Sequence, residues 1–402
     1  MLPTLLVIAS TYPRWKGDHE PGFVHELAKR LTDEFQVVAL VPHAPGAVAR
    51  EMLDGVEIIR YRYAPARFET LVNDGGIVTN LRGHPWKLLL VPGFVLAQAW
   101  CAWRVLRTRR VAVIHAHWLL PQGLIVATLR WLSRRCPPCL VTSHGADLFA
   151  LRGRWLNALK RLVIRHATAA TVVSHAMLDE LARIGADVGK ISVQPMGVDL
   201  VHRFTPDQAV ERSTHEILFV GRLVEKKGLR HLLDAIPAVL AAVPHAKLSI
   251  AGFGPDEPAL RSQVERLKLD ASVQFLGAVS QQELPGLYRR AAVFVAPFVQ
   301  AASGDQEGLG LVCVEALGCG CPIVVSDLPA TRDVLPHGAG CIRVAPGNHV
   351  LLADAIVDIL VRGEVHRRGV ASCRAQVVQQ FDWRTVSGRY ADILQGCIDD
   401  HA

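Results

Sequence analysis

Short apolar runs rich in valine, isoleucine and leucine alternate along the chain with segments that have helical spacing of apolar residues, and the alternation occurs in two series. The runs of the first series are Leu5–Ala9, Val37–Val41, Val111–His115, Leu140–Thr142 and Ala169–Val173. Helical patterns separate them at Gly22–Leu31, Pro121–Leu132 and His175–Ile184. Buried strands that alternate with helices predict a parallel, doubly wound α/β sheet.

A second series opens after a loop-like linker that begins at Pro195 and ends near Arg212. Its runs are Glu216–Val220, Lys247–Ala251, Val273–Leu276, Val293–Ala296 and Pro322–Val325. The 402 residues suit two domains of about 150–200 residues each. We therefore predict Rossmann-like domains at 1–200 and 201–382, with a C-terminal helix (383–402) packing back on the first. In tandem, two such domains place the crevices at their strand ends across a cleft.

The most specific pattern follows the predicted strand Val293–Ala296. Glu307 stands before a glycine-rich turn, and the apolar run Leu309–Leu317, with Glu315 two turns in, predicts a helix. Glycines let a ligand approach the backbone, and a helix N-terminus suits a phosphate. Two carboxylates at such a site would accept hydrogen bonds from sugar and ribose hydroxyls. The alternative is that Glu307 is a charge at the start of a helix and Glu315 a solvated residue.

A second pattern follows the predicted strand Glu216–Val220. The chain reads Gly221-Arg222 and then Lys227-Gly228 before the next helical segment. Arginine binds phosphate in a bidentate manner and lysine adds a point charge, so the two cations could stabilise a departing diphosphate. The alternative is a solvated basic turn.

Together these elements resemble the family 4 glycosyltransferases, which are retaining enzymes of the GT-B fold, and the resemblance covers nearly the whole chain. It implies that Arg222 and Lys227, beside Gly221, hold the donor diphosphate. It implies that Glu307 contacts the donor sugar and Glu315 the ribose. The backbone N–H groups that would help bind sugar and phosphate are those of Gly308, Leu309, Gly310 and Leu311.

The first half resembles the same family in three segments and departs from it in the N-terminal loop, where a single Gly22 stands in place of the usual Gly-Gly pair. A His-x-His segment after a strand implies that His117 reaches the transferred sugar, although a lone histidine at a strand end is more often structural. A His-Gly-x-Asp loop implies that His144 and Asp147 contact the acceptor. Gly22 would present its amide to the donor, and Pro195–Asp199 resembles a hinge in which Met196 replaces the usual asparagine. The acceptor domain is thereby expected at 1–200 and the donor domain at 201–382.

Several weaker patterns are set aside. Gly252-Phe-Gly254 begins like a dinucleotide fingerprint, but Glu257 replaces its third glycine. Cys136-Pro-Pro-Cys139 lacks a second pair for zinc. The nine scattered cysteines predict reduced thiols. We expect no cofactor and no metal, because two cations already face the leaving group.

The net charge of +7 is concentrated in residues 103–110, 130–135 and 152–166. These basic, tryptophan-containing segments predict either contact with an anionic membrane surface or merely solvated helix faces. The apolar stretch Leu88–Trp103 is interrupted by Pro92, Gly93 and Gln98 and falls short of the ~20 residues that span a bilayer. With no secretory signal recognised, we expect a cytoplasmic protein, peripheral on the membrane, that does not bind nucleic acid.

These features predict a retaining glycosyltransferase. It would move a sugar from a nucleotide-diphosphate donor, UDP-sugar first and GDP-sugar next, to a glycan or lipid-linked acceptor of surface polysaccharide or glycolipid synthesis. An alternative is a nucleotide-sugar epimerase, which would turn the donor over without an acceptor. Another is a non-enzymatic nucleotide-sugar-binding protein of the same fold. A phosphorylase is less suitable, because no lysine context for a pyridoxal cofactor is evident.

Overall fold

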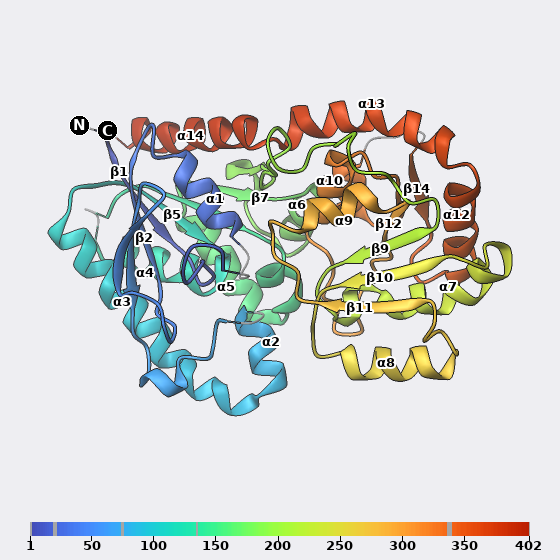
Figure 1. Ribbon diagram of the computed structural model, residues 1–402. Coiled ribbons are helices and arrows are strands. Elements are labelled where there is room, and N and C mark those ends of the chain that lie inside the picture. Colours follow the sequence, from blue (N-terminus) through green and yellow to red (C-terminus); the bar gives the residue numbers. More distant parts are fainter. Residues whose placement is uncertain (1, 19–21, 74–75, 134–135, 336–339, 402) are drawn as a thin grey trace. The chain divides into compact units, whose positions relative to one another are not determined.

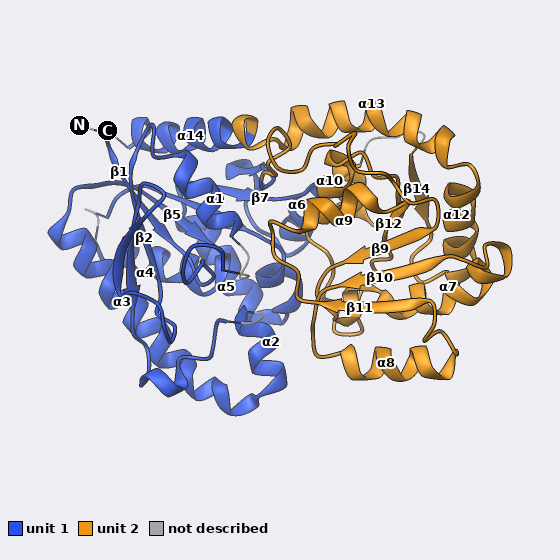
Figure 2. Cartoon of the chain, viewed as in Figure 1, with its two compact units in different colours: residues 1–196, 386–402 blue, residues 197–385 orange. Residues whose placement is uncertain are grey.

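The computed structural model describes residues 2–18, 22–73, 76–133, 136–335 and 340–401, and it divides into two compact units (Figures 1 and 2). Unit 1 comprises Met1–Met196 with Val386–Ala402, and unit 2 comprises Gly197–Thr385. The chain thus changes unit at 196/197 and 385/386, whereas the sequence pattern placed these points at 200/201 and 382/383.

The displaced boundaries have a local cause in unit 2. The segment after Met196 pairs with the segment before α14 (Trp383–Asp399), since the Val198 N–H donates to the Phe381 carbonyl and the Leu200 N–H to the Asp382 carboxylate. A Cβ at Gly197 would lie 2.5 Å from the Trp383 ring, so the ring packs directly on this glycine. These contacts hold residues 197–200 and 381–385 to the same unit.

Unit 1 is built on an eight-stranded sheet of order β3-β4-β2-β1-β5-β6-β7-β8, parallel except for the β3–β4 hairpin. Its strands are β1 (Thr4–Ile8), β2 (Gln36–Pro42), β3 (Arg50–Leu53), β4 (Val56–Tyr61), β5 (Val111–His117), β6 (Cys139–Ser143), β7 (Ala169–Val172) and β8 (Ile191–Val193). Its helices are α1 (Phe23–Arg30), α2 (Gly76–Gly83), α3 (Leu90–Thr108), α4 (Leu124–Leu132), α5 (Arg154–His166), α6 (His175–Arg183) and α14 from Val386 onward. Its short helical turns are η1 (Ala66–Phe68), η2 (Pro85–Leu89), η3 (Leu119–Gly123), η4 (Ala146–Ala150) and η5 (Val188–Lys190).

Helix α3 corrects an expectation about the apolar stretch near residue 90. Pro92 lies in the first turn, where its missing N–H costs no helical hydrogen bond, and η2 and α3 together run from Pro85 to Thr108. Gly93 lets the helix approach the sheet, because a Cβ there would lie 2.7 Å from the Tyr63 carbonyl oxygen. By length and composition this stretch could cross a membrane, so the prediction that it is too short was wrong.

Unit 2 has a six-stranded, parallel sheet of order β11-β10-β9-β12-β13-β14. Its strands are β9 (Glu216–Val220), β10 (Lys247–Ala251), β11 (Val273–Gly277), β12 (Val293–Ala296), β13 (Ile323–Ser326) and β14 (Cys341–Val344). Its helical elements are η6 (Glu225–Lys227), α7 (Leu229–Ala242), α8 (Glu257–Arg266), α9 (Leu284–Arg290), α10 (Leu311–Gly318), α11 (Pro329–Val334), α12 (His349–Val361) and α13 (Gly363–Phe381). A core of valine, leucine and isoleucine from β9, β10, α7 and α12 fills one face.

The strand orders locate the ligand edge of each sheet. In unit 2 the strand order corresponds to 3-2-1-4-5-6. Successive strands are added on one side of β9 up to β11 and on its other side from β12 onward, so the switch point lies between β9 and β12. In unit 1 the switch point lies between β1 and β5. Doubly wound sheets bind ligands beyond the carboxyl ends of the strands at this point. Gly221 and Arg222 follow β9, and His117 ends β5, so both predicted motifs lie at these positions.

Candidate active site

In unit 2 an ion pair joins the two predicted donor motifs. The Lys227 Nζ lies 2.7 Å from a Glu307 carboxylate oxygen, although the residues are 80 positions apart. Lys227 ends the turn η6 after β9, and Glu307 lies in the loop between β12 and α10. The lysine ammonium also lies 4.8 Å from the centre of the Phe298 ring. The topology therefore brings the two motifs together at the switch point of the sheet.

A second ion pair runs beside the first. The Lys226 Nζ lies 3.2 Å from an Asp305 carboxylate oxygen and also donates to the Gln306 carbonyl. The Val299 N–H donates in turn to the Lys226 carbonyl. The sequence pattern assigned no role to Lys226 or Asp305, although each stands within two residues of a predicted site residue. Their contacts fasten the loop that carries Glu307 to the turn that carries Lys227.

The electrostatics of Glu307 keep it ionised. Burial alone would raise the pKa of this carboxyl, but the charges of Lys227 and Lys226 and hydrogen bonds from Lys227 and the Gly310 N–H outweigh that effect. The pKa of Glu307 is lowered to about 2. A carboxylate that stays charged accepts hydrogen bonds and does not act as a proton donor near neutral pH. This property suits hydroxyl binding better than acid catalysis.

The turn before α10 differs from its predicted form. The helix begins at Leu311, not Leu309, because Gly310 has a left-handed backbone (φ +84) that ends the extended loop. Gly308 and Leu309 therefore precede the helix, and Glu315 lies one turn in, not two. The Gly310 N–H donates to Glu307, so this amide is already used within the protein.

Glu315 pairs with a residue that the sequence pattern did not single out. The hydroxyl of the buried Tyr288, on helix α9, donates to a Glu315 carboxylate oxygen at 3.0 Å. Burial raises the pKa of Glu315 to about 7, although the Tyr288 hydrogen bond and the charges of Arg203 and Lys227 lower it. Glu307 and Glu315, eight residues apart, thus have opposite pKa shifts. No short-range sequence signal could have identified Tyr288, which comes from another helix.

In unit 1, two predicted histidines form a stacked pair. The His117 Nδ1 lies 2.9 Å from the His144 Nε2, and the ring planes are within 13°. Phe23 and Trp118 pack against His144 with ring centres 4.9 Å and 5.1 Å away. Burial lowers the pKa of His144 to about 3, and burial together with neighbouring histidines holds the pKa of His117 well below its usual value. Both rings are therefore neutral at pH 7, one donating to the other.

Asp147 is buried and accepts hydrogen bonds within unit 1. The residue is 2% exposed, and its carboxylate accepts hydrogen bonds from the Leu119 N–H and the Ser143 hydroxyl. Ser143 precedes His144 in the chain, and Leu119 is two residues after His117. Asp147 thus ties the loop after β5, which follows His117, to the loop after β6, which carries His144, and its contact with the acceptor stays a prediction.

The N-terminal loop before Gly22 contains an internal ion pair. Arg14 donates two short hydrogen bonds to the Asp18 carboxylate, so its guanidinium is held within the loop. Gly22 immediately precedes α1, and its carbonyl accepts from the Glu26 N–H. Residues 19–21 of the same predicted loop lie outside the described part of the chain.

Comparison with known proteins decides the family. Residues 23–202 match the profile described as "Glycosyltransferase Family 4", and residues 214–362 match "Glycosyl transferases group 1". The chain is 30% identical, over 280 residues (65% of this chain, 70% of the relative), to the GDP-mannose-dependent alpha-(1-6)-phosphatidylinositol monomannoside mannosyltransferase of Mycobacterium tuberculosis. The chain belongs to glycosyltransferase family 4.

Further similarities agree with this family 4 assignment. The glycogen synthase of Mycobacterium tuberculosis is 25% identical over 405 residues, covering 97% of this chain and 94% of the relative. Sucrose-phosphate synthase from Thermosynechococcus elongatus superposes with a TM-score of 0.79 at 20% identity, covering 99% of this chain and 100% of that chain. HepE from Anabaena, in complex with UDP-glucose, gives 0.70 at 19% identity and 98% and 99% coverage. The fold is of the GT-B type, and the chain is a sugar transferase of the hexosyltransferase kind.

The structure shows a packing role for Gly252 and Gly254 and the state of the cysteines. Gly252 and Gly254 allow the turn after β10 to pack on the turn after β9, because a Cβ at either would lie within 2.3 Å of the carbonyl oxygen of Gly221 or Leu223. All nine cysteines lie in the described residues and are free thiols. The glycine pair therefore supports the Gly221-Arg222 turn.

Proposed function

We propose that this family 4 enzyme is a retaining transferase that moves a hexosyl group from a nucleotide-diphosphate sugar to a glycan or lipid-linked acceptor. The proposal places it in surface polysaccharide or glycolipid synthesis. The observation that carries the proposal is the Lys227–Glu307 ion pair at the switch point of the unit 2 sheet. A cation and an ionised carboxylate side by side match the two ends of such a donor, which presents a diphosphate next to sugar hydroxyls.

In the proposed complex each group keeps the charge it has in the free protein. Lys227 and Arg222 bind the diphosphate, and Glu307 accepts hydrogen bonds from the sugar hydroxyls. A carboxylate has about four acceptor positions. Lys227 and the Gly310 N–H occupy part of this capacity, which leaves acceptor positions for a sugar.

The proposed reaction proceeds on one face of the sugar. The bond between the anomeric carbon and the phosphate oxygen breaks while the bond to the acceptor oxygen forms on the same side. The departing phosphate oxygen takes the proton of the acceptor hydroxyl. Lys227 and Arg222 stabilise the negative charge that grows on the leaving diphosphate. Glu307, with a pKa of about 2, is suited to orienting the sugar, because a carboxylate with so low a pKa is a poor base.

We propose that the reaction needs neither a metal ion nor a cofactor, because the lysine and arginine supply the positive charge. We also assign the neutral pair of His117 and His144 to hydrogen bonding with sugar and acceptor hydroxyls. A neutral imidazole with one N–H can donate to a hydroxyl without being charged first. The enzyme is proposed to be cytoplasmic, where its nine free thiols stay reduced.

The nucleotide sugars to be tested as donors are chosen from the sequence pattern and from the relatives. The sequence pattern favoured a UDP-sugar, with a GDP-sugar next, and a relative at 30% identity is named as GDP-mannose-dependent. The test therefore compares UDP-glucose, UDP-N-acetylglucosamine, ADP-glucose and GDP-mannose, each with an oligoglucan and with phosphatidylinositol vesicles. We expect one donor to be consumed only when an acceptor is present, and the product to keep the anomeric configuration of the donor by NMR.

Two results would contradict the proposal. An inverted product would exclude the one-face mechanism. Consumption of the donor to an epimeric nucleotide sugar without acceptor would favour the epimerase alternative. The named relatives are transferases, which speaks against that alternative and against a non-enzymatic role.

Donor affinity should depend on pH through Glu315. If the ribose hydroxyls donate to this carboxylate, the ionised form binds better. With a pKa of about 7 in the free enzyme, the ionised fraction falls by about tenfold between pH 8 and pH 6. We expect the Kd of the intact nucleotide sugar to rise by about the same factor over that range. Isothermal calorimetry measures this, and Glu315→Gln should give a flat profile.

The same group has a linked effect on stability. Its folded pKa lies above that of the unfolded chain, so the folded state binds more protons between about pH 4.5 and pH 7. The contribution of Glu315 to stability is therefore full below pH 4.5 and is lost as the pH rises through 7.

A pH-independent Kd in the wild-type enzyme would contradict the assignment of Glu315 to the ribose. The variant Tyr288→Phe should raise the pKa of Glu315 further and shift the binding profile to higher pH.

A further inference from the structure

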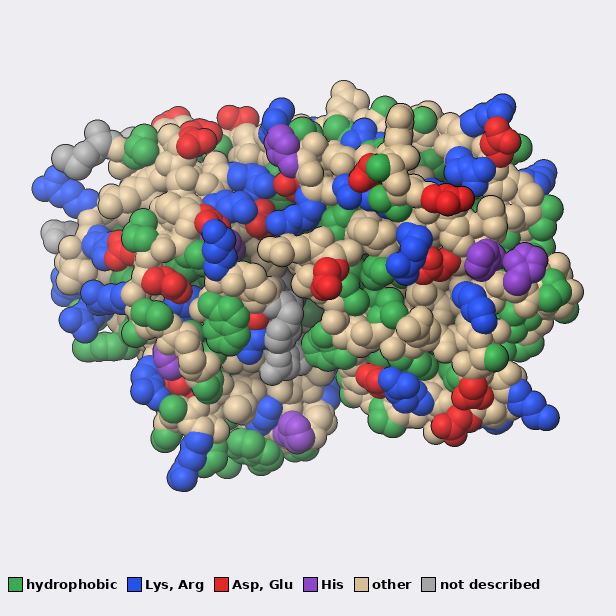
Figure 3. All heavy atoms as spheres, in the orientation of Figure 1, with side chains coloured by type: hydrophobic (Ala, Val, Ile, Leu, Met, Phe, Trp, Pro, Cys, Tyr) green, Lys and Arg blue, Asp and Glu red, His purple; other side chains and the backbone are tan. Residues whose placement is uncertain are grey.

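The helical stretch Pro85–Thr108 of unit 1 has an unusual distribution of apolar residues. It is apolar enough for a membrane helix, yet only 22% of its most apolar window is buried in the protein. A core helix of the same composition would be mostly buried. Many of the hydrophobic side chains of this stretch therefore face outward. In Figure 3, hydrophobic side chains gather on the lower left of unit 1, over the elements that Figure 1 labels α2 and α3.

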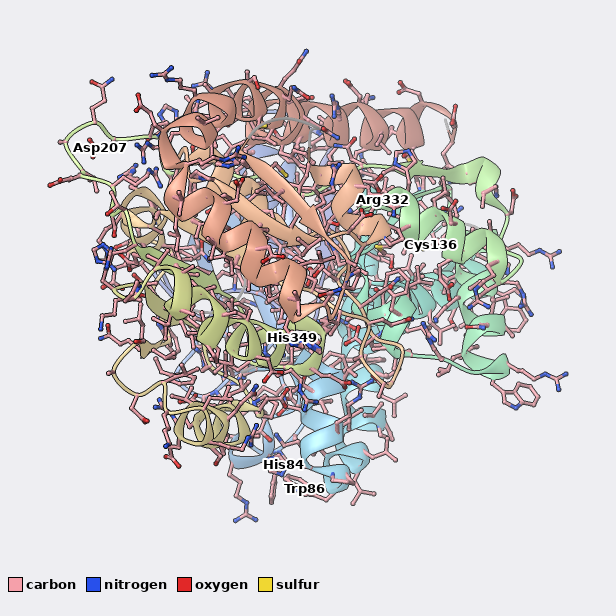
Figure 4. All side chains as sticks on the ribbon, turned by 90° about the vertical axis from the view of Figure 1, so that its right-hand side faces the viewer. His84, Trp86, Cys136, Asp207, Arg332 and His349 are labelled. Carbon is pink, nitrogen blue, oxygen red and sulfur yellow. The ribbon has the colours of Figure 1, made fainter. Side chains whose placement is uncertain are left out.

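The outward residues share one face of the helix. Leu89, the last residue of η2, is 82% exposed, and Leu96, Trp100 and Trp103 of α3 are 69%, 62% and 40% exposed. Their spacing of seven, four and three residues places them along one stripe. The preceding turn η2 adds Trp86 (49% exposed) and Leu88 (63% exposed), and Figure 4 labels Trp86 beside His84 at the start of η2. We call this set the outer stripe.

The opposite face explains why the helix does not need the outer stripe for folding. Phe94, Gln98, Ala102 and Val105 are buried against unit 1. The buried Gln98 donates to the Ala9 carbonyl and accepts from the Gln122 side chain. The buried face thus contains a polar residue while the exposed face has none before Arg104, which reverses the usual pattern of a surface helix.

The charges of the segment are arranged at its ends. Lys87 is the single charged residue between positions 85 and 103, and it is buried, with its Nζ bound to the Thr70 carbonyl and the Asn80 side chain. Four arginines then follow within residues 103–110, with no acidic residue among them. Arg109 pairs with Glu57, whereas Arg104, Arg107 and Arg110 are exposed.

Aromatic contacts connect the apolar and basic parts. The Trp100 and Trp103 rings stack with centres 4.9 Å apart, and the Arg107 guanidinium lies 5.4 Å from the Trp103 ring. Exposed leucines and tryptophans with adjacent arginines are typical of a helix that lies in a membrane interface, where tryptophan sits at the headgroup level and arginine contacts phosphates. The charge of the arginines selects an anionic surface.

We propose that the outer stripe docks the protein on an anionic lipid bilayer, with η2 and α3 lying in the membrane interface. Crossing the membrane would require α3 to leave the sheet and to expose Gln98 to lipid, so the helix lies on the surface. A second copy of the chain is less suited to cover the outer stripe. It would place a second set of exposed arginines, at positions 104, 107 and 110, against the first, with no acidic residue in the same segment. This docking does not depend on the identity of the donor.

The direction of α3 relates the docking surface to the catalytic edge of unit 1. The segment that contains η2 leaves the carboxyl end of β4, and α3 then runs back to enter β5 at its amino end. The η2 end of the stripe therefore lies on the side of the sheet where His117 ends β5. A lipid-linked acceptor embedded beside η2 would present its headgroup on that side. The sequence pattern had assigned membrane contact to residues 130–135 and 152–166 as well, of which 134–135 lie outside the described residues.

The first experiment is co-sedimentation of the full chain with vesicles of phosphatidylcholine alone or mixed with phosphatidylglycerol. We expect binding to the anionic vesicles only. The double variant Leu96→Ser/Trp100→Ser should weaken that binding by about tenfold or more, since two large side chains leave the acyl and headgroup regions. The control Val350→Ser/Val361→Ser changes two residues of α12 that are 56% and 68% exposed. It should bind as the wild type does.

A second arm tests the arginines. Arg104→Gln/Arg107→Gln should weaken binding to anionic vesicles and reduce its dependence on salt, because fewer phosphates are contacted. Arg266→Gln/Lys268→Gln removes the same charge from an exposed part of unit 2 and should have little effect. All variants should keep the wild-type melting temperature, since the replaced side chains are exposed.

Three outcomes would overturn the proposal. The first is a wild-type chain that does not sediment with anionic vesicles. The second is an outer-stripe variant that binds as well as its control. The third is a wild-type dimer in light scattering that Leu96→Ser/Trp100→Ser dissociates, because the stripe would then be covered by a second copy of the chain.

Discussion

Replacing Lys227 with methionine should lower kcat by about two to three orders of magnitude, the loss seen when one preorganised group that stabilises transition-state charge is removed. Methionine keeps most of the aliphatic length of the side chain but removes the ammonium that lies over the Phe298 ring, and with it the charge that faces the leaving diphosphate. The Km for the donor should change less than kcat, because charge grows on the diphosphate only as the bond breaks. Steady-state rates with a saturating acceptor measure the effect.

The neighbouring lysine provides a matched control. Lys226→Met removes an equal charge one residue away, but this lysine pairs with Asp305 and holds the loop. Its loss should cost about tenfold or less in kcat, because the cation that contacts the donor remains. Equal losses in both variants would contradict a specific role for Lys227 and would favour a general effect of the local positive potential.

A double variant separates chemistry from folding. Lys227→Met leaves the buried Glu307 without its ammonium partner, which destabilises unit 2 and raises the pKa of Glu307. Adding Glu307→Gln removes the unpaired charge, so the melting temperature should recover. The rate should not recover, because neither group is present to bind the donor. Recovery of both would show that the ion pair is structural.

The fold was predictable where strands are buried on both faces. The central strands β1 and β9 are apolar after their first residues, β12 is apolar throughout and β5 is apolar from Val111 to Ile114, as is typical of a parallel sheet. Strand β4 was missed, because it contains Glu57 and Arg60. The structure pairs them with Arg109 and Glu51, contacts that lie up to 52 residues away.

The candidate site was predictable in its motifs but not in its contacts. The Gly-Arg and Lys-Gly elements and the two glutamates fall at the switch point of the unit 2 sheet, since their order after strands fixes where they lie. The Lys227–Glu307 pairing depends on which strands are neighbours, and the Tyr288 hydrogen bond depends on how α9 packs. The burial of Asp147 depends on the loop after β5. None of these is encoded in local spacing.

The outer stripe is a third feature that local sequence did not predict. Pro92 and Gly93 seemed to interrupt the apolar run, because both residues weaken helices in isolation. In the structure the proline occupies the first turn, and the glycine is required by the Tyr63 carbonyl. The sequence pattern could locate the apolar residues but could not show which of them face outward.

Gly228→Ala should be among the most damaging single changes in unit 2. Gly228 has a left-handed backbone (φ +69), and an added Cβ would lie 1.8 Å from the Pro297 carbonyl oxygen, so the turn could not stay where it is. The left-handed strain costs about 1–2 kcal/mol and the overlap about 1–3 kcal/mol more. Because Lys227 is the preceding residue, its ammonium would move away from Glu307. We expect a lower melting temperature of unit 2 together with a large loss of kcat.

Gly277→Ala separates strain from overlap, because Gly277 has nearly the same backbone angle (φ +70) but no atom of the described residues within 4 Å of an added Cβ. It should cost only the left-handed strain of about 1–2 kcal/mol and leave kcat near the wild-type value. Gly286→Ala, in helix α9 with open space around it, should be neutral or slightly stabilising. Differential scanning calorimetry of the three variants ranks them. If Gly228→Ala matched Gly277→Ala in both stability and rate, the close approach of Pro297 would not fix the position of Lys227. The proposed placement of the lysine at the leaving group would then lose its structural basis.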